Sequence, residues 1–321
     1  MPGSSEGLSP QTMINAPLGA CLGPSALVRL LEAHRAWLQR RPGGQRASLK
    51  GIALTEAVLE KVNLERADVS SANLRGANLS GANLRAAVFN WADLSNATLL
   101  EADLSQAALE EMKAENALFG GANFSESRIV QSCFRQANLR QARLLEADME
   151  QSEFRGADLW QASLQQTKAF DCNFAEARLE QTNLYHATLR CCNLTGISAA
   201  GSNWSTATLQ SCELRRAGLS GARFDQADLR QSSFWGANLG GCSFQKAKLN
   251  GVNMGTADLS GARFHEAATL SADFRGANLR SAQGFTPTQL SQARTDHETV
   301  LPDGSHGPFL MGSGAHRPCR L

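Results

Sequence analysis

Over most of this chain, every fifth position holds a large apolar residue with few exceptions, and the register never shifts. The series begins at Leu49 and runs to Leu279, a total of 47 positions, of which 38 hold Leu or Phe. Two residues before each of these centres stands Ala, Ser, Cys or Thr in 42 of the 47 units. Because no insertion or deletion breaks the register, this repeat must dictate the fold of most of the 321 residues.

A period of five residues fits neither kind of regular secondary structure. In an α-helix, successive centres would rotate by about 140° and spread around the whole cylinder. In a β-strand, they would alternate between the two faces. The pattern therefore predicts a backbone that turns after every five residues. The large centre fills an interior, and the small residue points the same way near the corner.

The units also resemble those of a known family. Runs such as Ala72-Asn73-Leu74-Arg75-Gly76 match the A-[D/N]-L-x-x unit of pentapeptide-repeat proteins, over nearly three quarters of the chain. This resemblance implies an all-β solenoid, namely a right-handed quadrilateral parallel β-helix in which four units make one coil of about 20 residues. The repeat length then predicts about 12 coils, with short helical caps at both ends.

The aromatic centres indicate the same 20-residue coil independently. When centres are sorted by multiples of twenty, nine of the eleven Phe fall on two opposite faces. Cys172, Cys192 and Cys212 follow the same spacing, and all three occupy the small inward position. Stacked coils place like residues over one another, as in other repeat architectures.

Both ends of such a stack need a cap, because they would otherwise expose apolar surface and unpaired strand edges. Residues 24–41 predict an amphipathic helix with Ser25 as N-cap and His34 packed on its apolar stripe. The capping box from Thr286 to Gln289 predicts a short second helix. The expected organisation is a disordered tail (1–23), a capping helix and linker (24–46), the repeat (47–282), a C-terminal cap (283–301) and a second disordered tail (302–321).

No group of residues has the spacing of a catalytic or metal site. The eight Cys include no C-x-x-C pair, and the six His include no H-E-x-x-H motif. In the resembled family, the Asp or Asn before each centre hydrogen-bonds within the turn, which makes acid–base chemistry improbable for these residues. We therefore expect no enzyme activity, catalytic residue, cofactor, metal ion or small-molecule substrate.

The outward positions offer two kinds of candidate contact for a protein partner. Acidic residues concentrate between 93 and 126, where the only outward basic residue is Lys113. Aromatic residues also take outward positions where a polar residue would be expected, which is typical of partner contacts. The candidate partner-binding residues are Asp93, Glu101, Asp103, Glu110, Glu111, Glu115, Trp160, Phe170, Tyr185 and Trp235.

These observations favour a non-enzymatic protein-binding scaffold or adaptor that uses the outer faces of a rod. Some pentapeptide-repeat proteins present a DNA-like acidic rod to DNA gyrase, so the resemblance adds a DNA-mimic modulator of gyrase or topoisomerase as an alternative. Delivery to a host cell as a bacterial effector is a second alternative. The near balance of 31 Lys+Arg against 30 Asp+Glu counts against the mimic, and it makes nucleic acid an unlikely partner.

The sequence also limits the cellular setting and assembly. No apolar run approaches the roughly 18 residues of a membrane helix, and the first 25 residues lack the pattern of a signal peptide. Unpaired cysteines fit a cytoplasmic protein. We expect a monomer or an end-to-end dimer with a protein partner of unknown identity.

Overall fold

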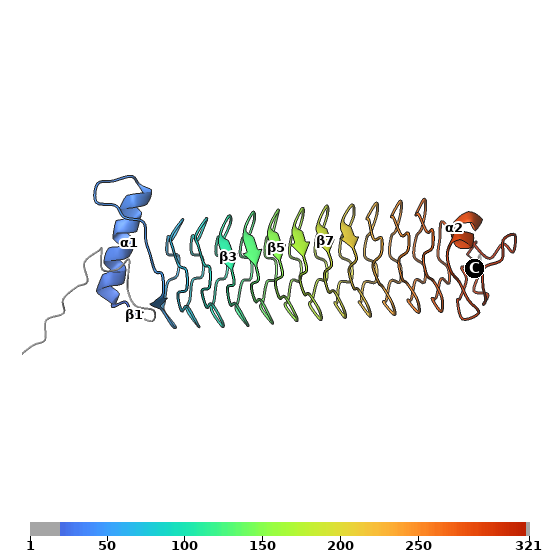
Figure 1. Ribbon diagram of the computed structural model, residues 1–321, viewed down its shortest axis with the longest axis horizontal. Helices are drawn as coiled ribbons and strands as arrows, with labels where there is room; N and C mark the ends of the chain where they lie inside the picture. The colour runs from blue at the N-terminus through green and yellow to red at the C-terminus, as the bar shows by residue number, and fades with distance from the viewer. Residues whose placement is uncertain (1–19, 319–321) are drawn as a thin grey trace, which may run out of the picture.

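The computed structural model describes residues 20–318 and shows a long parallel β-solenoid with two short helices. Helix α1 (Pro24–Leu38) lies at one end of the rod and helix α2 (Pro287–Gln292) at the other (Figure 1). Once in each five-residue unit, a parallel bridge joins a residue to the one twenty positions later, from Ser48 with Asp68 to Arg263 with Gln283. The coil length of 20 residues expected from the Phe and Cys columns is therefore present.

The backbone turns once in every unit. The residue two positions after each centre has a positive φ, as in Glu56 (57°) and Arg66 (60°). Few side chains favour this left-handed conformation, and the same position is glycine in units such as Gly76 (66°). Because it recurs every fifth residue, each coil turns four times, as the period of five predicts.

Continuous strands in the repeat are concentrated on one outer face, here called the strand face. They form a parallel six-stranded sheet in chain order, and each residue pairs with the one twenty later. This regular sheet spans about five turns, and it does not confirm the expected count of about 12 coils. The strands are β3 (Ala108–Glu110), β4 (Arg128–Val130), β5 (Asp148–Glu150), β6 (Lys168–Phe170), β7 (Thr188–Arg190) and β8 (Thr208–Gln210).

An opened turn explains why these six strands are longer than their neighbours. In an ordinary unit, the small residue closes the turn by donating its N–H to the preceding centre, as Ala107 does to the Leu104 carbonyl at 3.1 Å. After β3, the Met112 N–H instead donates to Ser132 Oγ of the next coil at 3.0 Å. The Ser132 hydroxyl in turn donates to the Leu109 carbonyl at 2.6 Å. The inserted hydroxyl holds the turn open, so the strand extends.

The column of inward residues that contains Ser132 coincides with the extent of the strands. Ser or Cys fills it at 132, 152, 172, 192, 212 and 232, one coil after each of the six strands. In the coil before this run, the column holds Met112, which lies one coil after Ala92. The turn at Ala92 is closed, because the Ala92 N–H donates to the Phe89 carbonyl at 2.9 Å. In the coil after the run, the column holds Val252, which lies one coil after Ser232. The turn at Ser232 is also closed, because the Ser232 N–H donates to the Leu229 carbonyl at 3.2 Å. Neither Met nor Val carries a hydroxyl or thiol that could bridge the turn.

The repeat centres fill the interior of the rod. Phe154 stacks between Phe134 and Phe174, with ring centroids 5.0 and 4.8 Å apart. Trp204 is fully buried, and its indole N–H donates to Ser202 Oγ at 2.6 Å. The buried apolar side chains form one continuous core that runs through the repeat.

At the N-terminal end, α1 covers the first coil. The short strand β1 (Ala20–Cys21) pairs in parallel with β2 (Ile52–Ala53), and α1 then begins at Pro24. The expected N-cap Ser25 is wrong: Gly23 is the N-cap, because proline has its φ fixed for the first helical turn and lacks an N–H. The helix also ends at Leu38, three residues earlier than expected. Residues 1–19 of the expected N-terminal tail lie outside the described residues.

His34 and two leucines seat α1 on the core. Leu27 and Leu30 pack against the core cluster, and His34 is fully buried, as its place on the apolar stripe predicted. The Ala47 N–H donates to His34 Nδ1 at 3.1 Å, which ties the helix to the start of the repeat.

At the C-terminal end, the predicted capping box is confirmed. Gln289 N–H donates to Thr286 Oγ1 at 3.2 Å, and Thr286 N–H donates to Gln289 Oε1 at 2.6 Å. The composition predicts a disordered tail from 302, whereas the structure places 302–318 in turns. An antiparallel bridge from Val300 to His306 starts this segment, and Phe309 packs on the core, so buried apolar contacts give it a defined place. Residues 319–321 lie outside the described part.

Candidate functional site

The candidate residues are distributed around the whole rod. Residues that differ by a multiple of twenty stack in one column, so the position within the coil sets the face. The strand face carries Glu110, Glu111 and Phe170, and the next face along the chain carries Asp93, Glu115 and Trp235. The third face carries Glu101 and Trp160, and the fourth carries Asp103 and Tyr185. The acidic block is therefore a ring around the rod and does not form a stripe along it.

Arginines from adjacent coils neutralise much of this ring. Arg128 pairs with Glu110 and Arg135 pairs with Glu115, each from one coil further on. The Arg135 guanidinium, followed by the Cys133 thiol, lowers the pKa of Glu115 by hydrogen bonding. At Asp93, burial raises the pKa, but hydrogen bonds from Ser95 and Arg75 outweigh it and lower the pKa overall. These carboxylates stay charged, and their charges are locally compensated.

The four candidate aromatics stand out more clearly, because three of them have an arginine beside the ring. Arg140 lies 4.5 Å from the Trp160 ring centroid, and Arg190 lies 5.9 Å from that of Phe170. In each pair, the arginine and the aromatic residue are twenty positions apart, so they stack in one column. A guanidinium at this distance from an aromatic face is held by a cation–π attraction. Tyr185 instead packs edge-on against His186.

Trp235 has the most specific surroundings of the four. Its side chain is 40 % exposed, and the Arg216 guanidinium lies 5.8 Å from the ring centroid. One coil further on is Gly255, where an added Cβ would lie only 3.3 Å from Trp235 Cδ1. A side chain at 255 would therefore crowd the indole. Glycine here lets the ring lie against the next coil while leaving part of it open to a partner.

The arginines are functional candidates that sequence reasoning missed. The signal was present for two of them, because Arg140 and Arg190 each lie one period away from an outward aromatic. Arg216 lies nineteen residues before Trp235, so the repeat alone does not place it over the ring. The contact depends on the side-chain conformations of Arg216 and Trp235.

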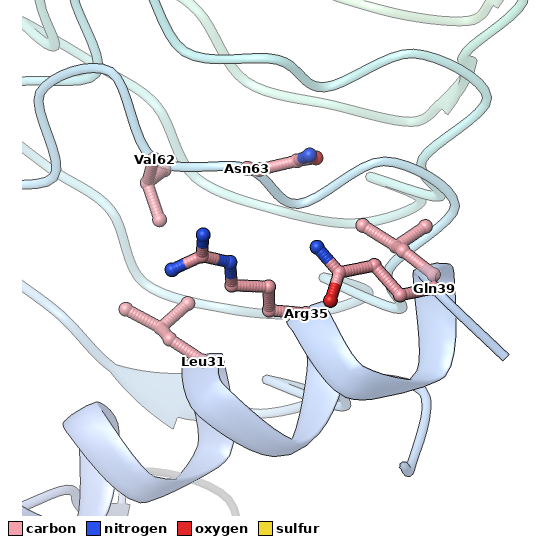
Figure 2. Close-up of a pocket in the computed structure, with 6 residues that line it drawn as sticks. Leu31, Arg35, Gln39, Val62 and Asn63 are labelled. Atoms are coloured by element: carbon pink, nitrogen blue, oxygen red, sulfur yellow. The ribbon is translucent and has the colours of Figure 1, made fainter. Parts of the chain in front are cut away.

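A cleft between α1 and the first coil was also not predicted. It has a volume of about 320 Å³ and is shown in Figure 2. The cleft lies between the C-terminal half of α1 and residues 62–63 of the first coil. No sequence pattern encodes how far a helix stands from a coil. The lining residues are Leu31, Arg35, Leu38, Gln39, Val62 and Asn63.

The buried thiols belong to the core. Burial raises the pKa of Cys242 to about 12, which disfavours the reactive thiolate. Within residues 20–318, no three His, Cys, Asp or Glu side chains are grouped as metal ligands. In the same part of the chain, neither helix has the length and apolar character needed to cross a bilayer.

Comparison with protein families gives one match. A family model described as pentapeptide repeats matches in eight copies, at residues 45–76, 63–100, 102–141, 132–168, 170–203, 189–231, 222–261 and 257–294. No curated protein matches the chain.

Several solved structures are similar to this chain. HetL, a pentapeptide repeat protein involved in heterocyst differentiation regulation from the cyanobacterium Nostoc sp. strain PCC 7120, is 26% identical; the match covers 89% of this chain and 99% of HetL, with a TM-score of 0.29. QnrB1, a plasmid-mediated fluoroquinolone resistance protein in trypsin-treated form, is 20% identical over 59% of this chain and 89% of its own, with a TM-score of 0.29. A pentapeptide repeat protein of the Arabidopsis thaliana thylakoid lumen is 29% identical; the match covers 30% of this chain and 63% of that protein, with a TM-score of 0.25.

Proposed function

Because this chain belongs to the pentapeptide-repeat family, we propose that it is a non-enzymatic scaffold or adaptor that binds protein partners on the outer faces of its β-solenoid. The filled interior supports this proposal. Core residues such as Phe154 and Trp204 are fully buried, so contacts with other molecules fall on the outer faces and the two ends.

The observation that carries the proposal is Trp235 with Arg216 and Gly255. Trp and Arg are among the residues that most often dominate the binding energy of protein interfaces. The Arg216 guanidinium and the backbone at Gly255, which has no side chain, pack against the indole and fix its position before a partner binds. Less side-chain entropy is then lost on binding, which favours affinity.

A quantitative capture experiment tests this surface. The full chain, its Trp235→Ala variant and a matched Thr195→Ala control are immobilised, and proteins retained from a lysate of the source organism are compared. Thr195 occupies the same column two coils earlier, so it reports what a truncation on this face does by itself. We expect a specific partner to be retained about 30-fold less well by Trp235→Ala, which corresponds to about 2 kcal/mol. Equal retention by all three proteins would contradict the proposal.

A DNA-mimic modulator of gyrase is less well supported. Its favourable feature is the acidic block between 93 and 126, but those residues encircle the rod, and Glu110 and Glu115 are paired with arginines. A gyrase supercoiling assay with the purified chain distinguishes the two functions. Inhibition that weakens when Glu110, Glu111 and Glu115 are changed to Gln would favour the mimic over the scaffold.

A further inference from the structure

The cleft beneath α1 combines apolar walls with a single cation. Leu31 and Leu38 face it from the helix, and Val62 faces it from the first coil. Figure 2 shows the Arg35 side chain extending from α1 toward Val62 and Asn63. The cleft lining contains no Asp or Glu, and none of the ion pairs among residues 20–318 involves Arg35. Such a cleft is complementary to a carboxylate close to an aliphatic side chain.

We infer that the chain's own N-terminal segment, residues 1–19, docks in this cleft, with Glu6 against Arg35 and Leu8 against Leu31 and Val62. Glu6 is the only charged side chain among these nineteen residues, and Leu8 is the aliphatic side chain nearest to it. Charge and apolar character on the two sides therefore match.

The segment is long enough to reach the cleft. Residue 20 lies at the first coil, where β1 pairs with β2. The twelve residues from Leu8 to Ala20 span up to about 40 Å when extended. Helix α1, which the segment must follow to reach Arg35, is only about 22 Å long.

Tethering favours this occupant over a free ligand. A cleft of about 320 Å³ is at the small end for a ligand site, so a free molecule would bind it weakly. A segment joined to the same chain is present at an effective concentration in the millimolar range. At that concentration, contacts worth about 4 kcal/mol fill the cleft half of the time, and this is the upper range for one ion pair together with one buried aliphatic side chain.

Carbodiimide coupling tests the contact in the full chain. Arg35→Lys places an amine in the cleft that can couple to a touching carboxylate, and Arg29→Lys is the matched control, since Arg29 is also exposed on α1 but does not line the cleft. We expect the intramolecular 6–35 product, identified by mass spectrometry, to exceed the 6–29 product at least fivefold. Equal yields, or a 6–35 product formed only between two molecules, would overturn the inference.

A charge exchange provides a second, independent readout. Arg35→Glu should increase chymotrypsin cleavage at Leu8 about five- to tenfold, because the segment is repelled from the cleft. Combining Arg35→Glu with Glu6→Arg should restore slow cleavage. Failure of the double variant to restore protection, with the circular dichroism of the rod unchanged, would mean that the segment does not use this ion pair.

Discussion

Ser132 Oγ accepts the backbone N–H of Met112 across the gap between two coils, at 3.0 Å. Because the same hydroxyl also donates to the Leu109 carbonyl, one side chain satisfies both groups that an ordinary turn would pair directly. The strand β3 gains its length from this bridge. A residue that sequence reasoning treats as a small alanine substitute thus determines local backbone geometry one coil away.

Removing this hydroxyl should destabilise the rod. Ser132→Ala leaves the Leu109 carbonyl and Met112 N–H unpaired in the core, and we expect a loss of about 1–3 kcal/mol in the free energy of unfolding by urea. The amide of Met112 should also exchange faster with deuterium. Ser220→Ala, on the exposed surface, is the control and should change little. A loss below about 0.5 kcal/mol would mean that the turn simply closes, as the one between Phe89 and Ala92 does.

Neighbouring positions should differ sharply in their tolerance of charge. Ala222 is fully buried, so Ala222→Asp should prevent folding or cost at least about 3 kcal/mol. Gly221→Asp should cost only about 1 kcal/mol, because the added Cβ meets no atom within 4 Å and only the positive φ of 68° opposes it. Soluble yield and thermal unfolding of the two variants measure the difference. Similar behaviour of both would contradict the assignment of inward and outward positions.

Truncating a stacked core ring should be costly in proportion to its burial. Phe154→Ala leaves a cavity between Phe134 and Phe174, and we expect a loss of about 3–5 kcal/mol in unfolding free energy. Phe170→Ala removes the same side chain from the strand face, where it is 37 % exposed, and should cost far less. Denaturation of the two variants under the same conditions tests this contrast.

The docking of α1 should weaken in acid. Burial lowers the pKa of His34 below 6.5, and the Arg46 charge lowers it further. The backbone and carboxylate of Glu65 raise this pKa but do not outweigh burial. Trp37 stacks on the His34 ring. The Ala47 N–H needs an unprotonated Nδ1 as its acceptor. Since the unfolded state then binds more protons than the folded state, this contribution is fully present above pH 6.5 and is lost as the pH falls toward the lowered folded pKa.

Hydrogen exchange over 24–38 at several pH values measures this loss, after correction for intrinsic exchange rates. Protection should fall between pH 6.5 and the lower folded pKa, while protection in β3–β8 stays constant. His34→Leu should remove the pH dependence, although it lowers the protection at every pH. A wild-type profile that is flat across this range would show that His34 does not control the docking of the helix.

The repeat register, the inward and outward positions and both capping helices were predictable because they depend on local patterns. A period of five requires a turn in every unit, and the Thr286–Gln289 box needs only residues three positions apart. Three of the candidate aromatics, Phe170, Tyr185 and Trp235, are exposed, and their role in partner binding stays a prediction. The pairing of Glu110 with Arg128 was not predicted, because it joins residues in different coils and depends on side-chain direction.

The sequence by itself determined that the chain winds with a five-residue step around an apolar interior, since that step is repeated 47 times along the chain and needs no distant partner. Tertiary structure alone decided where turns open, how Arg216 reaches Trp235, and where α1 leaves a cleft beside Val62. These features arise between coils or between a coil and a helix. Their energies depend on atoms brought together by stacking, about twenty residues or more apart along the chain.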